Sequence, residues 1–121
     1  MQKNPLLSVE RRGDVAIART TTSTLRDTVE VGEFERELNR LVDEEGASKL
    51  VLNLATIKLL SSSVLSVLVR INRKTKAAGG GIKLCHVNRD TMEVLRVMRL
   101  TKIFDVCDTE ERAVEGFAPA P

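Results

Sequence analysis

The feature that most constrains this fold is an alternation of short apolar runs and amphipathic segments. Residues 49–54 form a run of the kind that fills a buried parallel strand, and residues 82–87 form another. The segments that follow these runs repeat their apolar residues with helical spacing. This alternation predicts an α/β layered domain with a mainly parallel sheet.

The first part of the chain predicts a hairpin followed by a helix. Strands are expected over 7–11 and 15–19, joined by Gly13-Asp14, and an amphipathic helix over 29–45. We expect a mixed, mostly parallel sheet of four to five strands with this N-terminal hairpin and with helices packed on it. The remaining predicted elements are a helix from the 61–63 serines to Ala78, a helix over 88–99, a short strand over 103–106 and a final helix over 110–117.

Length and composition fit one domain that buries a core. The chain has 121 residues, of which 42% are hydrophobic and 30% charged. We expect one domain over 6–117, with flexible ends at 1–5 and 118–121.

Composition also argues against several classes of function. A net charge of +2 is too small for a surface that coats nucleic acid, and three Phe without Trp or Tyr give no stacking platform. Two Cys and one His do not make a closed zinc site. We therefore expect no metal, no cofactor and no direct nucleic-acid partner.

The chain also predicts a cytoplasmic protein with no membrane partner. Residues 1–12 contain no apolar stretch typical of a signal peptide. The most apolar window, 64–69, is far shorter than the roughly 20 residues of a membrane span. Cys85 and Cys107 do not form a disulfide framework, which favours a reducing compartment, and we expect them to be reduced neighbours across the sheet.

Three consecutive serines, Ser61, Ser62 and Ser63, lie where a strand gives way to a helix. One interpretation is that one of them is simply the helix N-cap. Another is that a phosphate is tolerated there, because unsatisfied N–H groups and the positive end of the helix dipole face it.

A helical wheel separates a core face from an outer face of this helix. Ser62, Ser66, Arg70 and Arg73 fall together on the outer face. Leu65 and Val69 lie beside Ser62, either as an exposed docking patch or packed under the loops before the helix. The predicted core face comprises Val64, Val67, Leu68, Ile71 and Ala78.

Two other features of this region have ordinary structural interpretations. Gly79-Gly80-Gly81 follows a helix and precedes a strand, which indicates a C-cap and tight turn and not a phosphate loop. The basic residues of the same helix are typical of a solvated face: Arg70, Arg73, Lys74 and Lys76.

Residues 51–54, followed by 61–68, resemble the STAS domain of anti-sigma factor antagonists. In that family a buried strand leads to an Asp-Ser-Ser-Gly-Leu motif that opens a helix, and the first serine is phosphorylated. Residues 79–85, 94–95 and 100–104 continue the resemblance, which covers the domain as a whole.

The resemblance implies a partner-switching regulator with Ser62 as phosphoacceptor and Ser61 or Ser63 as alternatives. Its partner would be an anti-sigma factor that is also a serine protein kinase, bound only by the unmodified protein. The sequence departs from the motif twice, with Ser61 at the Asp position and Val64 at the Gly position. Asp27 weakly matches an Asp of the family in the loop before the first helix. The expected partner-binding residues are Ser62, Ser63, Leu65, Ser66, Val69 and Arg73.

Two alternatives to this switch remain open. The first is a STAS-like structural subunit of a larger signalling assembly that is not itself switched, and a homodimer is also compatible with the sequence. The second is an enzyme, which we do not expect, because the sequence offers no nucleophile–base pair and no correctly placed phosphate loop. His86 beside Cys85 does not supply such a pair, since adjacent strand residues point to opposite faces.

Overall fold

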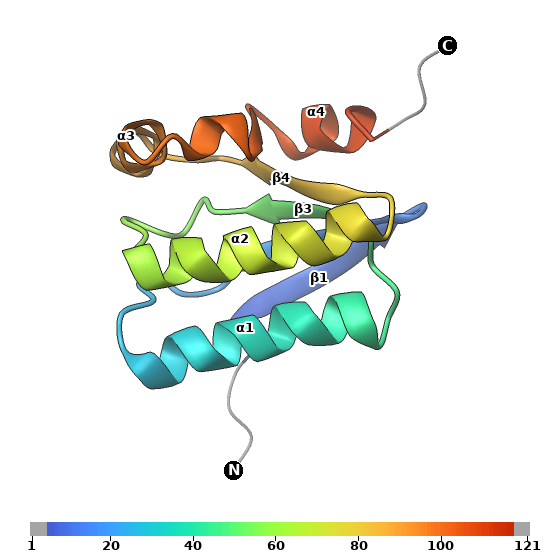
Figure 1. Cartoon of the computed structure of the whole chain (residues 1–121), viewed down its shortest axis with the longest axis horizontal. Helices are drawn as coiled ribbons and strands as arrows, with labels where there is room; N and C mark the ends of the chain where they lie inside the picture. Colours follow the sequence, from blue (N-terminus) through green and yellow to red (C-terminus); the bar gives the residue numbers. More distant parts are fainter. Residues whose placement is uncertain (1–4, 118–121) are drawn as a thin grey trace.

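Five strands form one mixed sheet in the order β1-β2-β3-β4-β5 in the computed structural model, which describes residues 5–117 (Figure 1). β1 pairs antiparallel with β2, and every other neighbouring pair is parallel. The predicted mostly parallel sheet with an N-terminal hairpin is confirmed. The strands are β1 (Leu7–Arg12), β2 (Val15–Thr20), β3 (Lys49–Asn53), β4 (Gly81–Cys85) and β5 (Asp105–Cys107).

The predicted order of strands and helices is also confirmed. The last strand differs from its predicted bounds, because Ile103 and Phe104 both donate their backbone N–H to the Leu100 carbonyl and close a 3-10 turn before the strand begins. The helices are α1 (Thr28–Asp43), α2 (Ser62–Ala77), α3 (Arg89–Val97), the 3-10 helix η1 (Leu100–Lys102) and α4 (Glu110–Glu115).

Apolar side chains on both faces of the central strands produce two cores. On one face, Leu50 and Leu52 of β3 belong to the main cluster, together with buried residues of α1, α2 and α3. On the other face, Val51 joins a smaller cluster that includes Ala113 of α4. Successive strand residues alternate between faces, so the continuous apolar run predicted from sequence is what a strand covered on both sides requires. Figure 1 shows α1 and α2 side by side on one face.

A polar side chain caps the N-terminus of each α-helix. Asp27 accepts a hydrogen bond from Glu30 N at 2.8 Å, and Asn88 accepts one from Thr91 N at the same distance. Ser61 and Thr109 cap α2 and α4 in the same way. These caps satisfy backbone N–H groups that have no partner within the helix.

The three glycines after α2 form the predicted turn between a helix and a strand. Gly79 has a φ of +93°, a conformation that favours glycine, and Gly80 packs directly on the backbone of Ser48. Ala78 is exposed at the C-cap, so its predicted place on the core face is wrong. The wheel extended the helical repeat to a residue where the helix has already ended.

The predicted flexible ends fall mostly outside the described residues. Residues 1–4 and 118–121 are not described. Pro5 is exposed, and its carbonyl accepts a 2.7 Å hydrogen bond from Thr21 Oγ1.

Replacing Gly80 with Ala should lower the free energy of unfolding by about 3 kcal/mol, because the added Cβ would overlap the Ser48 carbonyl. Gly32→Ala is the matched control, because Gly32 lies within α1 and its Cβ would meet only the end of the Arg36 side chain. This control should gain up to about 1 kcal/mol from helix propensity. Urea denaturation measures both changes. Equal effects at the two sites would contradict the close packing at Gly80.

Candidate functional site

Three loops meet where the parallel strands β2, β3 and β4 end. Parallel strands direct their carboxyl ends to one edge of a sheet, so the segments 21–27, 54–61 and 86–88 gather there, together with the start of α2 (Figure 1). The serine triplet therefore lies at an edge to which three separate parts of the chain contribute.

Side-chain hydrogen bonds hold the loop that leads into α2. Thr56 Oγ1 lies 2.7 Å from the Thr22 carbonyl oxygen and 2.6 Å from Thr20 Oγ1. On the other side, Asn88 donates its side-chain N–H groups to the carbonyls of Ile57, at 3.0 Å, and Lys58, at 2.7 Å. The β3–α2 loop is thus fixed to both neighbouring loops before the serines begin.

The three serines have different environments. Ser61 is the N-cap of α2, and its Oγ accepts a 3.3 Å hydrogen bond from Val64 N. Ser62 and Ser63 are exposed, and neither side-chain hydroxyl has a hydrogen-bond partner among residues 5–117. The first turn of α2 contains no acidic residue. The capping interpretation therefore holds for Ser61, while the other two hydroxyls face solvent at the positive end of the helix.

The predicted outer face of α2 is confirmed. Ser62, Ser66, Arg70 and Arg73 are all exposed, and Ser66 Oγ donates to the Ser62 carbonyl at 3.1 Å. Arg70 forms two hydrogen bonds with the Glu35 carboxylate of α1, which lower the pKa of Glu35.

The basic stripe on α2 is not merely a solvated face, because two of its members bind α1. Besides the Arg70 pair with Glu35, Lys74 pairs with Asp43 at 2.8 Å. These contacts cross between two helices that lie side by side on the main core.

Leu65 is not exposed beside Ser62, and that interpretation of the wheel is wrong. Its side chain is only 1% exposed within the main core, while Val69 is half-buried. The alternative of burial holds for Leu65, which belongs to the main core cluster. A wheel drawn for an isolated helix contains no neighbouring segment, and here Met98 and Leu100 line one groove together with Leu65.

This groove, of about 240 Å³, unites four of the six predicted partner-binding residues. Leu65, Ser66, Val69 and Arg73 all line it. Ser63 instead lines a second, smaller pocket with Asp27 and with residues of the first turn of α1. Ser62 lines neither of these two pockets.

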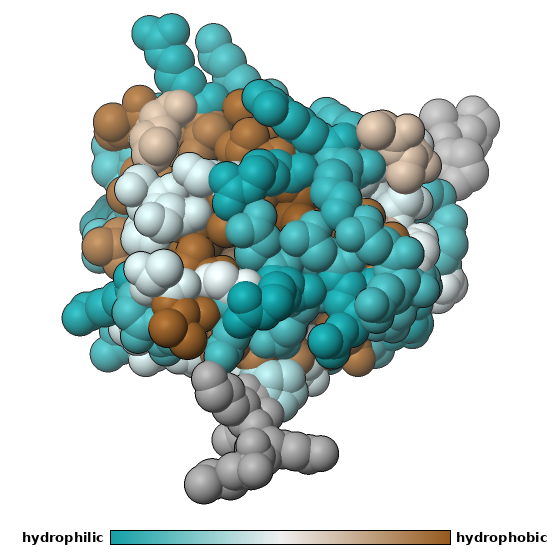
Figure 2. Space-filling view, turned by 60° about the horizontal axis from the view of Figure 1, so that its bottom comes forward, coloured by the Kyte–Doolittle hydropathy of each residue, from teal (hydrophilic) through white to brown (hydrophobic). Residues whose placement is uncertain are grey.

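Two exposed apolar side chains near this edge, those of Leu59 and Val29, were not predicted from the sequence. Leu59 is 55% exposed three residues before Ser62, and Val29 is exposed in the first turn of α1. The left-hand part of Figure 2, where α2 begins, mixes brown and near-white surface, while the right-hand part is mostly teal. Leu59 lies near the serine triplet in the sequence, but its exposure could not be predicted, because an exposed leucine and a core leucine look the same in the sequence.

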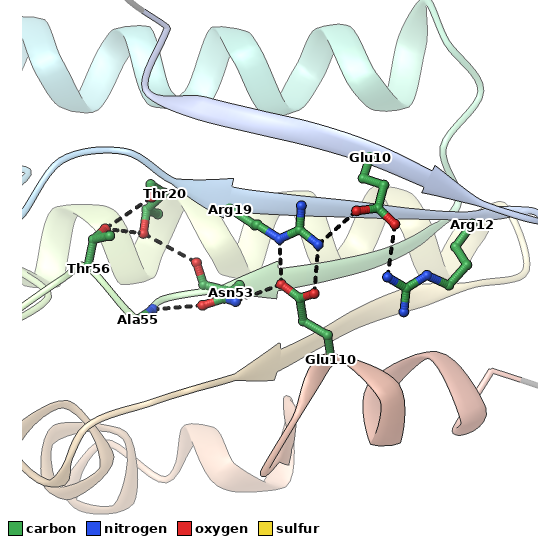
Figure 3. A network of polar contacts seen from close by, with 8 residues as sticks. All are labelled: Glu10, Arg12, Arg19, Thr20, Asn53, Ala55, Thr56 and Glu110. Atoms are coloured by element: carbon green, nitrogen blue, oxygen red, sulfur yellow. Dashed lines mark hydrogen bonds and ion pairs between the residues drawn. The ribbon is translucent and has the colours of Figure 1, made fainter.

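A polar network on the α4 face of the sheet reaches the same loop (Figure 3). The Glu110 carboxylate accepts hydrogen bonds from Arg19 Nε at 2.7 Å and from Arg19 Nη2 at 2.8 Å. It also accepts one from Asn53 Nδ2 at 2.7 Å. Asn53 Oδ1 in turn accepts from Ala55 N at 2.8 Å, so the network ends at the start of the β3–α2 loop.

The same contacts determine the ionisation of Glu110. Hydrogen bonding to Arg19 is the largest cause that lowers its pKa to about 2, and burial opposes this shift. Glu10 bridges Arg19 and Arg12, and these bonds also lower the pKa of Glu10. No pattern in the sequence indicated Glu110, because Arg19 lies 91 positions away in the chain.

The two cysteines are register partners on β4 and β5, as predicted. Both are free thiols, and burial raises the pKa of Cys85 to about 12, which disfavours the nucleophilic thiolate. His86 is exposed with a φ of +53° at the end of β4.

Within residues 5–117, no group of three His, Cys, Asp or Glu side chains is arranged to hold a metal ion. In the same part of the chain, no helix has the length and hydrophobicity needed to cross a membrane.

Comparisons with known proteins agree on one fold. The STAS domain family model matches residues 8–113. A Thermotoga maritima protein described as a putative anti-sigma factor antagonist matches with a TM-score of 0.83 and 22% identity, over 92% of this chain and 93% of that chain. The phosphorylated form of the Bacillus cell fate determinant SpoIIAA matches with a TM-score of 0.69 and 15% identity, over 93% and 99%. A chain of the stressosome matches with a TM-score of 0.68 and 16% identity, over 91% and 95%.

Replacing Glu110 with Gln should reduce the free energy of unfolding at pH 7 by about 1–3 kcal/mol, because a neutral amide loses the charge-assisted bonds to Arg19. The folded-state pKa lies below the ordinary value, so the wild-type contribution is present above about pH 4.5 and is lost as the pH falls towards 2.

Denaturant unfolding between pH 7 and pH 2 should therefore show a smaller decrease in stability for Glu110→Gln than for the wild type. Glu111→Gln, at the exposed neighbouring position of α4, is the control. Parallel curves for wild type and Glu110→Gln would show that this carboxylate is not a source of the acid sensitivity.

Proposed function

This chain belongs to the STAS domain family, and from that membership we propose that it is a protein-binding regulator acting as an anti-sigma factor antagonist. The unmodified protein binds an anti-sigma factor that is also a serine kinase, and phosphorylation of Ser62 releases that partner. The proposal is supported by one observation above all: the solvent-facing, unpartnered hydroxyl of Ser62 at the N-terminus of α2.

The environments of the three serines favour Ser62 as the acceptor. A phosphate on Ser61 would remove the cap that this side chain provides to Val64 N. A phosphate on Ser63 would enter a pocket that Asp27 also lines, and two negative charges would repel each other there. At Ser62 the first turn offers unsatisfied N–H groups without a nearby acid of its own.

The two departures from the family motif are compatible with this switch. Val64 is fully buried in the main core, so its side chain does not obstruct a partner at the surface. Ser61 takes the helix-capping role that an Asp at this position could also fill.

Phosphorylation would act directly on the docking surface. It adds nearly two negative charges beside the exposed Leu59 and the groove residue Ser66, in an area that a partner must desolvate. A penalty of about 3 kcal/mol weakens binding about a hundredfold. We further propose that the protein acts in the cytoplasm and is not an enzyme.

A second candidate is a structural STAS subunit of a larger signalling assembly that is not switched. It is favoured by the likeness to a chain of the stressosome and by Ser61 in place of the motif Asp. The two candidates differ in whether modification of Ser62 changes binding.

When the anti-sigma factor kinases encoded in the same genome are tested one at a time with ATP, the partner kinase should add the mass of one phosphate to the wild type. Ser62→Ala should abolish this addition, while Ser8→Ala, at an exposed position of β1 outside the docking surface, should retain it. Intact-mass spectrometry distinguishes the three proteins. Modification that persists in Ser62→Ala would place the acceptor elsewhere.

Ser62→Asp should weaken binding of the kinase partner about tenfold or more. Calorimetry measures this affinity for Ser62→Asp, for the wild type and for Ser8→Asp. Ser8 is an exposed residue of β1 and controls for added charge. Undiminished binding by Ser62→Asp, together with a stable large complex in light scattering, would favour the structural subunit.

A further inference from the structure

The small net charge of this chain conceals a strong local asymmetry. Residues 62–102, from the start of α2 to the end of η1, contain nine Lys and Arg but only two Asp and Glu. The whole chain has 19 basic and 17 acidic residues. The positive charge is therefore concentrated in one continuous stretch, and the rest of the chain is net acidic.

About half of these cations lack an anionic partner. Arg70 and Lys74 pair with α1, Lys83 pairs with Asp105, and Arg96 pairs with Glu93. The five others form no ion pair among the described residues: Arg73, Lys76, Arg89, Arg99 and Lys102. Their charge is available to a molecule outside the chain.

One of these free cations lines the groove between α2 and η1, and two others belong to the segment that forms its other side. Arg73 lines the groove itself, and Arg99 stands between the lining residues Met98 and Leu100. Lys102 ends η1. The groove has an apolar component in Leu65, Val69, Met98 and Leu100, and no carboxylate lines it. Met98 is 47% exposed and Val69 is half-buried, so these two side chains are open to a partner, while the buried Leu65 and Leu100 form the floor of the groove.

The backbone at Arg99 has an unusual conformation for a residue with a side chain. Arg99 has φ 60° and ψ 24°, a left-handed conformation that glycine adopts more easily than any residue with a Cβ. This residue links the C-cap of α3 to η1, where the chain turns between two groove residues. An arginine thus occupies a position that backbone preference alone would assign to glycine.

We propose that the groove lined by Leu65, Val69, Met98 and Leu100 binds an acidic amphipathic helix of a protein partner. Its apolar residues contact the groove, and its carboxylates pair with Arg73, Arg99 and Lys102. Helices bind apolar grooves through side chains spaced at i, i+3, i+4 and i+7. Binding of nucleic acid is disfavoured, because four of the lining residues are apolar and no aromatic side chain lines the groove.

The proposed helix belongs to the same partner as in the proposed function, and in this respect the inference rests on that function. The groove begins one turn along α2 from Ser62. The groove specifies the shape and the charge of the partner segment that contacts it.

A pair of synthetic peptides tests the proposal. Each is about 18 residues long, so that a helix can form, with Leu along one face and either Glu or Lys on the other. Titration into the labelled protein, followed by NMR, should shift the amide signals of Leu65, Val69 and Met98 with the Glu peptide. The Lys peptide should shift none of them, and added salt should weaken the Glu peptide because it screens the charges.

Two variants locate the charges. Arg99→Gly should weaken the Glu peptide about threefold, without loss of thermal stability, because it removes a cation at a backbone position that favours glycine. Arg73→Glu should weaken it about tenfold. Arg36→Glu, on the exposed surface of α1 and outside the groove, should bind as the wild type does.

Failure of the Glu peptide to shift these signals, or equal shifts with the Lys peptide, would overturn the proposal. So would unchanged affinity in Arg73→Glu. Phosphorylation of Ser62 by the kinase, assayed on the same wild-type protein, reports on the proposed function separately. A protein that is phosphorylated at Ser62 but does not bind the Glu peptide would refute the groove alone.

Discussion

Burial of three parallel strands on both faces is the constraint on which the rest of this structure depends. β2, β3 and β4 contribute alternate residues to two cores, so helices must cover each side of the sheet. Because these three strands are parallel, their carboxyl ends all lie at the same edge of the sheet. The loops that surround Ser62 are consequently neighbours in space, although they are far apart in sequence.

At that edge, the start of α2 separates a hydroxyl that caps the helix from two hydroxyls that face solvent. Ser61 satisfies the helix terminus, and Val64 anchors the first turn in the core. Ser62 is left with no structural duty and with the favourable field of the helix end. Modification of such a hydroxyl changes the surface without removing any contact that stabilises the fold, which is what a reversible switch of partners needs.

The second face of the sheet supports the same edge by a different interaction. Glu110 and Arg19 form a charge-assisted pair, and the Glu110 carboxylate also accepts a hydrogen bond from Asn53 (Figure 3). Asn53 in turn accepts a hydrogen bond from Ala55 N and so holds the start of the β3–α2 loop. A partly buried carboxylate with its hydrogen bonds satisfied is stabilising, whereas loss of either partner leaves a polar group unpaired. The short helix α4 is thereby linked to the loop that leads into Ser62.

Local pattern was enough for part of this description. Apolar periodicity identified the order of the elements, the outward direction of Ser62 and Arg73, and the glycine turn after α2, because these depend on neighbours within a few residues. The boundaries were less certain, as the displaced last strand and the exposed Ala78 show. The last strand begins later than predicted because the preceding residues donate hydrogen bonds to the Leu100 carbonyl. Ala78 is exposed because α2 ends before it, so the apolar repeat of the helix no longer applies.

The sequence by itself determined an α/β sheet with a serine triplet at a helix start, since hydrophobic spacing and capping chemistry are local properties. Only the tertiary structure decided that Leu65 is buried, that Met98 and Leu100 complete a groove with it, and that Glu110 of α4 meets Arg19 of β2. These contacts join segments that are distant in the chain. The energy of these contacts depends on how the helices pack on the sheet, and the apolar periodicity of a single segment cannot predict that packing.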